Sequence, residues 1–293
     1  MQSDFPLTDE DVINVAEGLV YDGGRLDPMR VKQWLRQFGS RERVIVAYTL
    51  LKAMRERWYF DATAMSILLD DAFKRAVARL SLGGQLGIGD AELAPVRERI
   101  CVGYFGPALK SGAEYCRTVK KKNRLVKSGD AAEALAWLAR QDRRSMVLFL
   151  DDVVGTGNQA SFFARKVLRE AVEGVIGSER IALFVPVFAY QEGVEQFQDI
   201  AAPIEIDPVK LLDDSDRAFS SEAKIFADDA ERMRAKEMCE EIGAELWPEH
   251  PLGYEGMQSL LVLHTAIPNA TLPIFWKEGM VRGLRWQPLF PHR

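Results

Sequence analysis

The sequence is poor in the residues that build the commonest metal and redox sites. Its 293 residues include three cysteines and three histidines. Cys101, Cys116 and Cys239 lie far apart and form no CxxC pair, which argues against a disulfide framework. Reduced thiols in a cytoplasm are the simplest interpretation.

Long apolar runs and targeting signals are missing as well. No uncharged stretch approaches the ~18 apolar residues of a membrane-spanning helix, so we expect no membrane partner. The first residues, MQSDFPLTDEDV, are acidic and do not fit a secretory signal peptide. The apolar content of 47% and charged content of 28% are typical of a soluble globular protein, which we expect in the cytoplasm.

Two common nucleotide-binding loops are also absent. The chain contains neither GxxxxGK[ST] nor GxGxxG, so a kinase and a dehydrogenase lose their main support. The formal net charge of −5 argues against a protein built wholly around nucleic acid. One segment departs from this balance, because residues 25–57 hold nine Lys and Arg against three Asp and Glu. It is either a solvated basic face or a surface for nucleic acid or a protein.

What the chain does contain is first a helical and then an alternating pattern. Thr8 and Asp27-Pro28 are helix-start signals, and apolar residues recur at helical spacing over residues 31–80. The glycine-rich segment 82–90 is the best linker candidate. We therefore expect a helical N-terminal region at residues 1–95 and an α/β domain at residues 96–293.

Beyond residue 95, apolar strands alternate with helices. Strands are expected at residues 99–105, 146–150, 181–190 and 204–209, and helices at 131–140, 158–173 and 228–247. This alternation predicts an α/β fold with a parallel, doubly wound sheet.

The most informative stretch is VLFLDDVVGTGNQ, residues 147–159. An apolar strand is followed directly by Asp151 and Asp152, which should lie at the carboxyl edge of the sheet, where ligands bind. Gly155 and Gly157 allow a tight turn that exposes amide N–H groups to an anion, beside the positive end of a helix. We interpret the stretch as a site for a ribose 5-phosphate, in which the carboxylates accept hydrogen bonds from the ribose hydroxyls. The alternative is an ordinary acidic turn.

This stretch closely resembles the phosphoribosyl diphosphate (PRPP) motif of type I phosphoribosyltransferases, with four apolar residues, two acids and a Thr-Gly turn. By that resemblance Asp151 and Asp152 bind the ribose hydroxyls and are catalytic, and PRPP brings Mg²⁺ near them. The residues implied to surround the 5′-phosphate are Val153, Val154, Gly155, Thr156, Gly157, Asn158 and Gln159. Asn158 and Gln159 depart from the family, which usually has Gly and then Thr or Ser at these places.

The resemblance also implies a pyrophosphate-binding turn within residues 106–117. Lys110 would be its catalytic cation, and Ser111 and Gly112 its phosphate donors; the alternative is an ordinary turn with a surface lysine. The basic run 120–124 falls where the family often has a flexible loop that closes over PRPP and brings cations to the departing diphosphate. The alternative for this run is a solvated face.

Softer features extend the resemblance over most of the chain. The helical N-terminus and the segments 207–219 and 251–276 are similar to the phosphoribosyltransferase-like effector family of bacterial conflict systems. Members of that family occur beside retron reverse transcriptases. The similarity implies a phosphoribosyltransferase-type sheet with a helical N-terminal extension and a C-terminal hood-like region. It also implies a role in anti-phage defence, a homodimer, and a reverse transcriptase with its noncoding RNA or DNA as partners.

Two groups of residues near the C-terminus have open roles. One group either stacks on a base or fills a core, and consists of Trp247, Tyr254, Trp276 and Trp286. The other group consists of Asp213, Asp214 and Asp216. These acids either lie near Mg²⁺ or the acceptor, or they cap a helix.

Three functions follow from these features. The first is an effector enzyme that transfers ribose 5-phosphate from PRPP to a nitrogen nucleophile, or cleaves a nucleotide at ribose C1. The second is a nucleotide-binding module that kept the ribose phosphate site and lost catalysis. The third is a nucleobase salvage phosphoribosyltransferase, which the additional N-terminal helices disfavour.

Overall fold

The structure, a computed structural model, describes residues 5–81, 96–106, 111–170 and 174–291. The chain divides into two compact units, Met1–Met65 with Asp213–Arg293, and Ser66–Leu212. This division does not follow the boundary expected after residue 95. The glycine-rich segment 82–90 on which that boundary depended lies outside the described residues.

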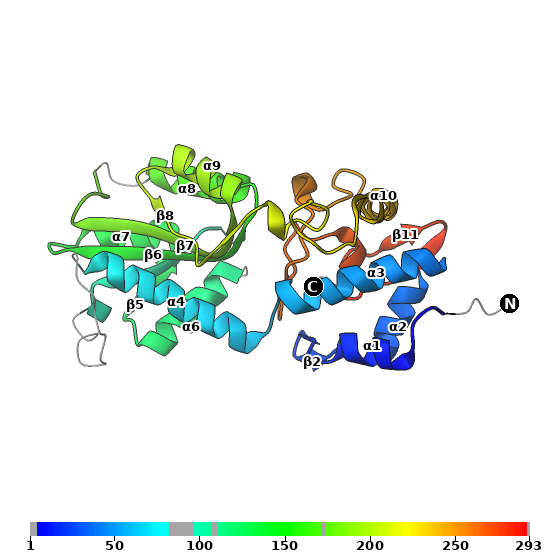
Figure 1. The fold of residues 1–293 in the computed structure, drawn as a ribbon. Helices are drawn as coiled ribbons and strands as arrows, with labels where there is room; N and C mark the ends of the chain where they lie inside the picture. The colour runs from blue at the N-terminus through cyan, green and yellow to red at the C-terminus, as the bar shows by residue number, and fades with distance from the viewer. Residues whose placement is uncertain (1–4, 82–95, 107–110, 171–173, 292–293) are drawn as a thin grey trace. The chain divides into compact units, whose positions relative to one another are not determined.

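The unit Ser66–Leu212 is built on a parallel sheet with the strand order β5-β4-β6-β7-β8, and β9 also pairs with β7 (Figure 1). The strands are β4 (Ile100–Tyr104), β5 (Lys127–Asp130), β6 (Ser145–Val154), β7 (Arg180–Tyr190), β8 (Glu205–Ile206) and β9 (Lys210–Leu212). The helices are α4 (Ala62–Leu80), α6 (Ser111–Asn123), α7 (Ala131–Ala139), α8 (Asn158–Glu170) and α9 (Gln191–Ala201). The predicted parallel, doubly wound α/β fold is confirmed.

Both faces of this sheet are covered, with α8 and α9 on one side and α4 and α6 on the other (Figure 1). Phe149 of β6 and Phe184 of β7 belong to the core shared with α7, α8 and α9. The ring of Phe149 stacks on Phe105 at a centroid distance of 4.4 Å, and Phe184 lies 4.9 Å from Phe197 of α9. Alternate residues such as Leu148 point to the opposite face and are also fully buried. Burial on both faces explains why these strands are continuous apolar runs.

Helix α4 is joined to this unit by ion pairs along its second half. Arg75 contacts Asp207 at 2.6 Å, and Arg79 contacts Glu205 at 2.6 Å. Asp70 contacts the ammonium group of Lys122 in α6 at 2.5 Å. These contacts explain why the helix groups with the sheet although its sequence continues the helical pattern of the N-terminus.

The other unit combines the N-terminal helices with the C-terminal segment. Its N-terminal elements are α1 (Asp9–Ala16), β1 (Val20–Tyr21), β2 (Gly24–Arg25), α2 (Pro28–Arg36), α3 (Arg41–Ala53), η1 (Met54–Trp58) and β3 (Tyr59–Phe60). Its C-terminal elements are η2 (Asp214–Asp216), α10 (Asp229–Leu246), η3 (Tyr254–Gly256), β10 (Val262–Leu263), η4 (Pro273–Phe275), β11 (Gly279–Val281) and β12 (Leu284–Trp286). The expected caps are confirmed, because Thr8 caps α1 and Asp27 caps α2 with Pro28 as its first residue.

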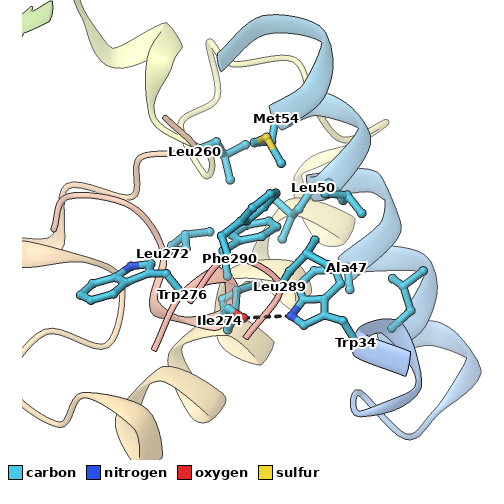
Figure 2. Close-up of a cluster of buried hydrophobic side chains, with 14 of the residues drawn as sticks. Trp34, Ala47, Leu50, Met54, Leu260, Leu272, Ile274, Trp276, Leu289 and Phe290 are labelled. Atoms are coloured by element: carbon cyan, nitrogen blue, oxygen red, sulfur yellow. Dashed lines mark hydrogen bonds between the residues drawn. The ribbon is translucent and has the colours of Figure 1, made fainter. Parts of the chain in front are cut away.

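One hydrophobic core holds these two parts together (Figure 2). Trp34 of α2 donates its indole N–H to the carbonyl oxygen of Ile274 at 3.0 Å, and its ring stacks on Phe275 at 5.2 Å. Leu50 and Phe290 are fully buried in the same cluster. The N-terminal helices therefore bury their apolar faces against residues more than 200 positions away in the sequence. Trp34 and Ile274, for example, are 240 positions apart. None of the described helices is both long enough and apolar enough to cross a membrane.

Candidate functional site

The two adjacent acids lie within β6, whereas the sequence suggested that they follow it. β6 pairs with β7 as far as Val154 opposite Ala189, so the ladder continues past Asp151 and Asp152. On its other side, the pairing of β6 with β4 ends at Phe149. The edge of the sheet is therefore stepped, and the two acids occupy the part of β6 that extends beyond β4.

The first turn of α6 meets this extension. The Ser111 hydroxyl donates to Oδ1 of Asp151 at 3.2 Å. A Cβ atom on Gly112 would lie 2.8 Å from the carbonyl oxygen of Leu150, so the helix approaches the strand this closely only with glycine there. The structure thus brings Ser111 and Gly112 to the predicted acids. Lys110, the predicted cation of the same turn, lies outside the described residues.

Burial raises the pKa of Asp151 well above its usual value of 3.8, and the charge of Asp152 adds to this effect. Oδ1 of Asp151 accepts from the amide N–H of Asp152 at 3.0 Å, and Oδ1 of Asp152 accepts from the amide N–H of Val153 at 2.8 Å. Both carboxyl groups thus accept hydrogen bonds from backbone amides in the part of β6 that extends beyond β4.

Tyr115 of α6 is a neighbour of the acids that the sequence analysis did not identify. Its side chain is buried, and burial raises the pKa of its phenol well above the usual value. The charges of Asp152 and Asp151 raise this pKa further. It lies four residues after Ser111, and residues at that spacing share one face of a helix. Helical spacing from Ser111 is the signal that could have found it.

The turn Gly155–Gly157 connects β6 to α8 and packs against the first turn of α9. Gly157 has φ of +81°, a conformation that favours glycine, and a Cβ atom there would lie 2.7 Å from the carbonyl oxygen of Gly193. A Cβ atom on Gly193 would overlap the carbonyl oxygen of Gly155. Glycine at both places lets the two backbones touch. Gly193 was not predicted, because it belongs to a different strand-to-helix junction.

Helix α8 begins directly after this turn. The amide N–H of Ser161 donates to the carbonyl oxygen of Gly157 at 2.9 Å, which is the first bond of the helix. The first turn of a helix has amide groups that no carbonyl of the helix accepts, and they suit an anion. Asn158, the first residue of α8, accepts a hydrogen bond at Oδ1 from Nε2 of Gln196 in α9 at 2.5 Å. The predicted 5′-phosphate residues thus meet α9, a contact absent from the sequence analysis.

The remaining members of the predicted phosphate loop divide between strand and helix. Val153 and Val154 are the last residues of β6, and Val154 is 3% exposed and belongs to the core. Thr156 is partly buried in the turn, and Gln159 is exposed in the first turn of α8. Val153 and Val154 therefore belong to the strand, whereas residues 155–159 form the turn and the start of α8.

The prediction of a flexible basic loop at residues 120–124 is wrong. Lys120, Lys121, Lys122 and Asn123 form the last turn of α6, where positive charges stabilise the negative end of the helix dipole. The helix ends at Asn123, and Arg124, which follows it, has φ of 55°. Ser111 is at the other end of α6, about 18 Å away at 1.5 Å per residue. These lysines therefore lie at the end of the helix opposite the acids.

The acidic run of residues 213–216 belongs to the unit with the N-terminal helices and caps a short helix, as the alternative interpretation held. Asp213 accepts from the amide N–H of Ser215 at 2.8 Å, and hydrogen bonds from the side chain and then the backbone of Ser215 lower the pKa of Asp213. Asp216 accepts from the indole N–H of Trp58 at 3.0 Å. These carboxylates have structural partners in their own unit.

The C-terminal aromatic residues are mainly core residues. Trp276 and Trp286 are 5% and 2% exposed, and their indole N–H groups donate to carbonyl oxygens of the same unit. Trp247 and Tyr254 are half-buried, with ring centroids 4.8 Å and 4.7 Å from His250. The core interpretation is confirmed for Trp276 and Trp286, and the hood-like role of the region stays a prediction.

The basic segment 25–57 is largely engaged within its own unit. Its intramolecular partners are Asp9 for Lys32, Pro288 for Arg30, Glu241 for Arg43, Asn14 for Arg55 and Ala223 for Arg57. The excess of positive charge is therefore spread over many internal contacts, and nucleic-acid binding stays a prediction.

Among the described residues, no group of three or more His, Cys, Asp or Glu side chains could hold a metal ion. Asp151 and Asp152 are the carboxyl groups of the β6 site. Two carboxylates with substrate phosphates are a usual ligand set for Mg²⁺, which seldom occupies an all-protein cage. The donor set therefore fits a magnesium ion that arrives with a diphosphate.

A family model described as PRTase-CE matches residues 31–292 of the chain. Among solved structures, the chain is similar to orotate phosphoribosyltransferase from Aeropyrum pernix, with 14% identity and a TM-score of 0.29 over 51% of this chain and 71% of that one. It is also similar to the AQ2163 protein from Aquifex aeolicus, with 14% identity and a TM-score of 0.31 over 64% of this chain and 85% of that one. The search of curated proteins found no match.

Proposed function

Because this chain belongs to the PRTase-CE family, a phosphoribosyltransferase-like family, we propose that its β6–α8 site binds the ribose 5-phosphate of PRPP or of a nucleotide. The observation that carries the proposal is the order of groups along one strand-to-helix junction. Asp151 and Asp152 lie near the end of β6, the Gly155–Gly157 turn follows Val154, and α8 begins directly after the turn. The carboxyl groups can accept hydrogen bonds from the ribose hydroxyls, and the turn with the start of α8 can bind the 5′-phosphate at the other end of the same ligand.

The proposed reaction is a displacement at ribose C1. The lone pair of a nitrogen nucleophile forms the new C1–N bond, the C1–O bond to pyrophosphate breaks, and pyrophosphate leaves with the bonding electrons. The proton of the nucleophile passes to solvent. Asp151 and Asp152 hold the ribose hydroxyls while the 155–159 segment holds the 5′-phosphate, so the sugar is fixed at both ends and C1 is oriented.

Ser111 has a positioning role in this proposal. Its hydroxyl donates to Oδ1 of Asp151 at 3.2 Å and so orients that carboxyl toward the ribose. Asp151 and Asp152 are the residues that would hold Mg²⁺. The ion, when bound, neutralises the charge that develops on the departing diphosphate.

The biological role that we infer is that of an effector in bacterial anti-phage defence. Its support is the resemblance of residues 207–219 and 251–276 to effectors that occur beside retron reverse transcriptases. Such a partner with its noncoding RNA would engage the protein in the cytoplasm. A host that carries the protein with its neighbouring genes should resist phage, and Asp152→Asn should abolish the resistance, whereas Asp199→Asn, an exposed change on α9, should not.

Binding is tested with a ligand series in the presence of Mg²⁺. PRPP and ribose 5-phosphate should bind, while ribose, which lacks the phosphate, should not. Asp152→Asn should weaken both phosphorylated ligands, and Asp199→Asn should leave them unchanged. Equal binding of ribose and ribose 5-phosphate would overturn the proposed phosphate site.

A second function, a nucleotide-binding module without turnover, is favoured by Asn158 and Gln159 at the end of the phosphate segment. These side chains are larger than the glycine and hydroxyl residues usual in the resembled motif. Release of pyrophosphate from PRPP, measured with a panel of nucleobases and nucleosides as acceptors, separates the two. Binding with no release for any acceptor would favour the module.

A further inference from the structure

Helix α9 forms a wall of the proposed phosphate site, and two contacts hold it there. The backbone of Gly193 touches the turn at Gly155 and Gly157, where Cβ atoms would collide. One helical turn further, Gln196 donates from Nε2 to Oδ1 of Asn158 at 2.5 Å. The same helix therefore supports the turn from its backbone and the first residue of α8 from a side chain.

The contact between Gln196 and Asn158 also sets the direction of an amide. An asparagine side chain has an oxygen that accepts and an NH₂ group that donates, on opposite branches of one planar group. Since the oxygen of Asn158 faces Gln196, its NH₂ group is directed away from α9. Asn158 directly follows Gly157, at the end of the turn that would surround the phosphate.

We infer that Gln196 is a positioning residue for phosphate recognition. It holds the Asn158 amide with its Nδ2–H group directed at the 5′-phosphate, and so makes Asn158 a side-chain donor at a place where the resembled motif usually has glycine. This inference rests on the proposed ribose 5-phosphate site. It assigns to this chain a phosphate site completed by a residue from the neighbouring strand-to-helix junction.

A purely structural role for the contact, which would only join α8 to α9, makes a different prediction. Gln196→Glu keeps the length and shape of the side chain but can only accept when ionised. It can bind Asn158 only by turning its amide, which then directs an oxygen at the phosphate. A structural contact tolerates this exchange, whereas phosphate recognition does not.

The experiment is a calorimetric titration of the full chain with ribose 5-phosphate at pH 7.5. Gln196→Glu should weaken binding roughly tenfold to a hundredfold, the range for a lost hydrogen bond to a charged group. Gln198→Glu adds the same charge to an exposed position of α9 and should leave the dissociation constant within about twofold.

A second variant covers the case in which Gln196→Glu unfolds. Asn158→Asp keeps an acceptor for Gln196 but replaces the NH₂ donor with an oxygen, and should weaken ribose 5-phosphate to the same degree. Wild-type affinity in either folded variant, or an equal loss in Gln198→Glu, would overturn the inference and leave the proposed function standing. Failure of the wild-type protein to bind ribose 5-phosphate would overturn both.

Discussion

Replacing Asp151 by Asn should stabilise the fold at neutral pH while it removes ligand binding. The carboxyl is held at a pKa well above 3.8 by burial first and by the charge of Asp152 second. A raised pKa in the folded state means that the folded protein binds this proton more tightly than the unfolded chain. The contribution of Asp151 to the free energy of unfolding is therefore greatest below about pH 3.8. It is lost as the pH rises through the pKa of this carboxyl in the folded protein.

The asparagine amide is neutral at all these pH values and keeps an oxygen for the Ser111 hydroxyl and the Asp152 amide. The gain at pH 7.5 should be at least about 1 kcal/mol, because a pKa raised by about one unit already corresponds to that free energy. Each kcal/mol corresponds to roughly 2–4 °C in melting temperature for a protein of this size class. Asp199→Asn, a change of an exposed acid on α9, should stay within about 0.5 kcal/mol of wild type.

The assay is thermal unfolding of wild type, Asp151→Asn and Asp199→Asn between pH 5 and pH 8. The melting temperature of Asp151→Asn should exceed that of wild type at pH 7.5, and the difference should narrow toward pH 5, where more of the wild-type carboxyl is protonated. A variant that melts below wild type at pH 7.5, or a difference that does not change with pH, would refute the reasoning.

Two further substitutions and one chemical test have outcomes that follow from the packing of the chain. Gly193→Ala should reduce the affinity for ribose 5-phosphate at least about tenfold, measured by calorimetry, because its Cβ overlaps a carbonyl oxygen of the phosphate turn; unchanged affinity would contradict the packing described here. Phe149→Ala should lower the free energy of unfolding by about 3–5 kcal/mol in urea, and a loss below about 1 kcal/mol would show that the sheet core is not packed as described. Cys101, Cys116 and Cys239 should not react with an aromatic disulfide reagent at pH 8 until urea is added, because they are buried and burial raises the pKa of each thiol, to about 12 for Cys101. Fast reaction of any of them in the folded protein would place that thiol at the surface.

The central strands could be predicted because they are buried on both faces and so consist of apolar residues alone. β5 could not be, since it is a short edge strand of the sequence KSGD in which Lys127 and Ser128 are exposed. The run 120–124 was misassigned because a cluster of lysines is typical of loops, whereas at a helix C-terminus the same charges are stabilising.

The two acids and the glycine turn could be identified from the sequence because one strand-to-helix junction contains them all. The residues that complete the site come from other junctions. Ser111 was found through a family resemblance, but Gly193 and Gln196 follow the next strand, and no local pattern links them to residues 155–158. The contact between Trp34 and Ile274 could not be predicted for the same reason, since the two residues are 240 positions apart and neither segment alone indicates its partner.

The measurement that tests the central claim most directly is a calorimetric titration with PRPP and Mg²⁺ of wild type beside Asp151→Asn/Asp152→Asn. The account predicts saturable binding to the wild-type protein, with one site per chain, and none to the double variant, although that variant should fold with at least wild-type stability. Equal binding to both proteins, or no binding to the folded wild type, would contradict a ribose 5-phosphate site at the end of β6.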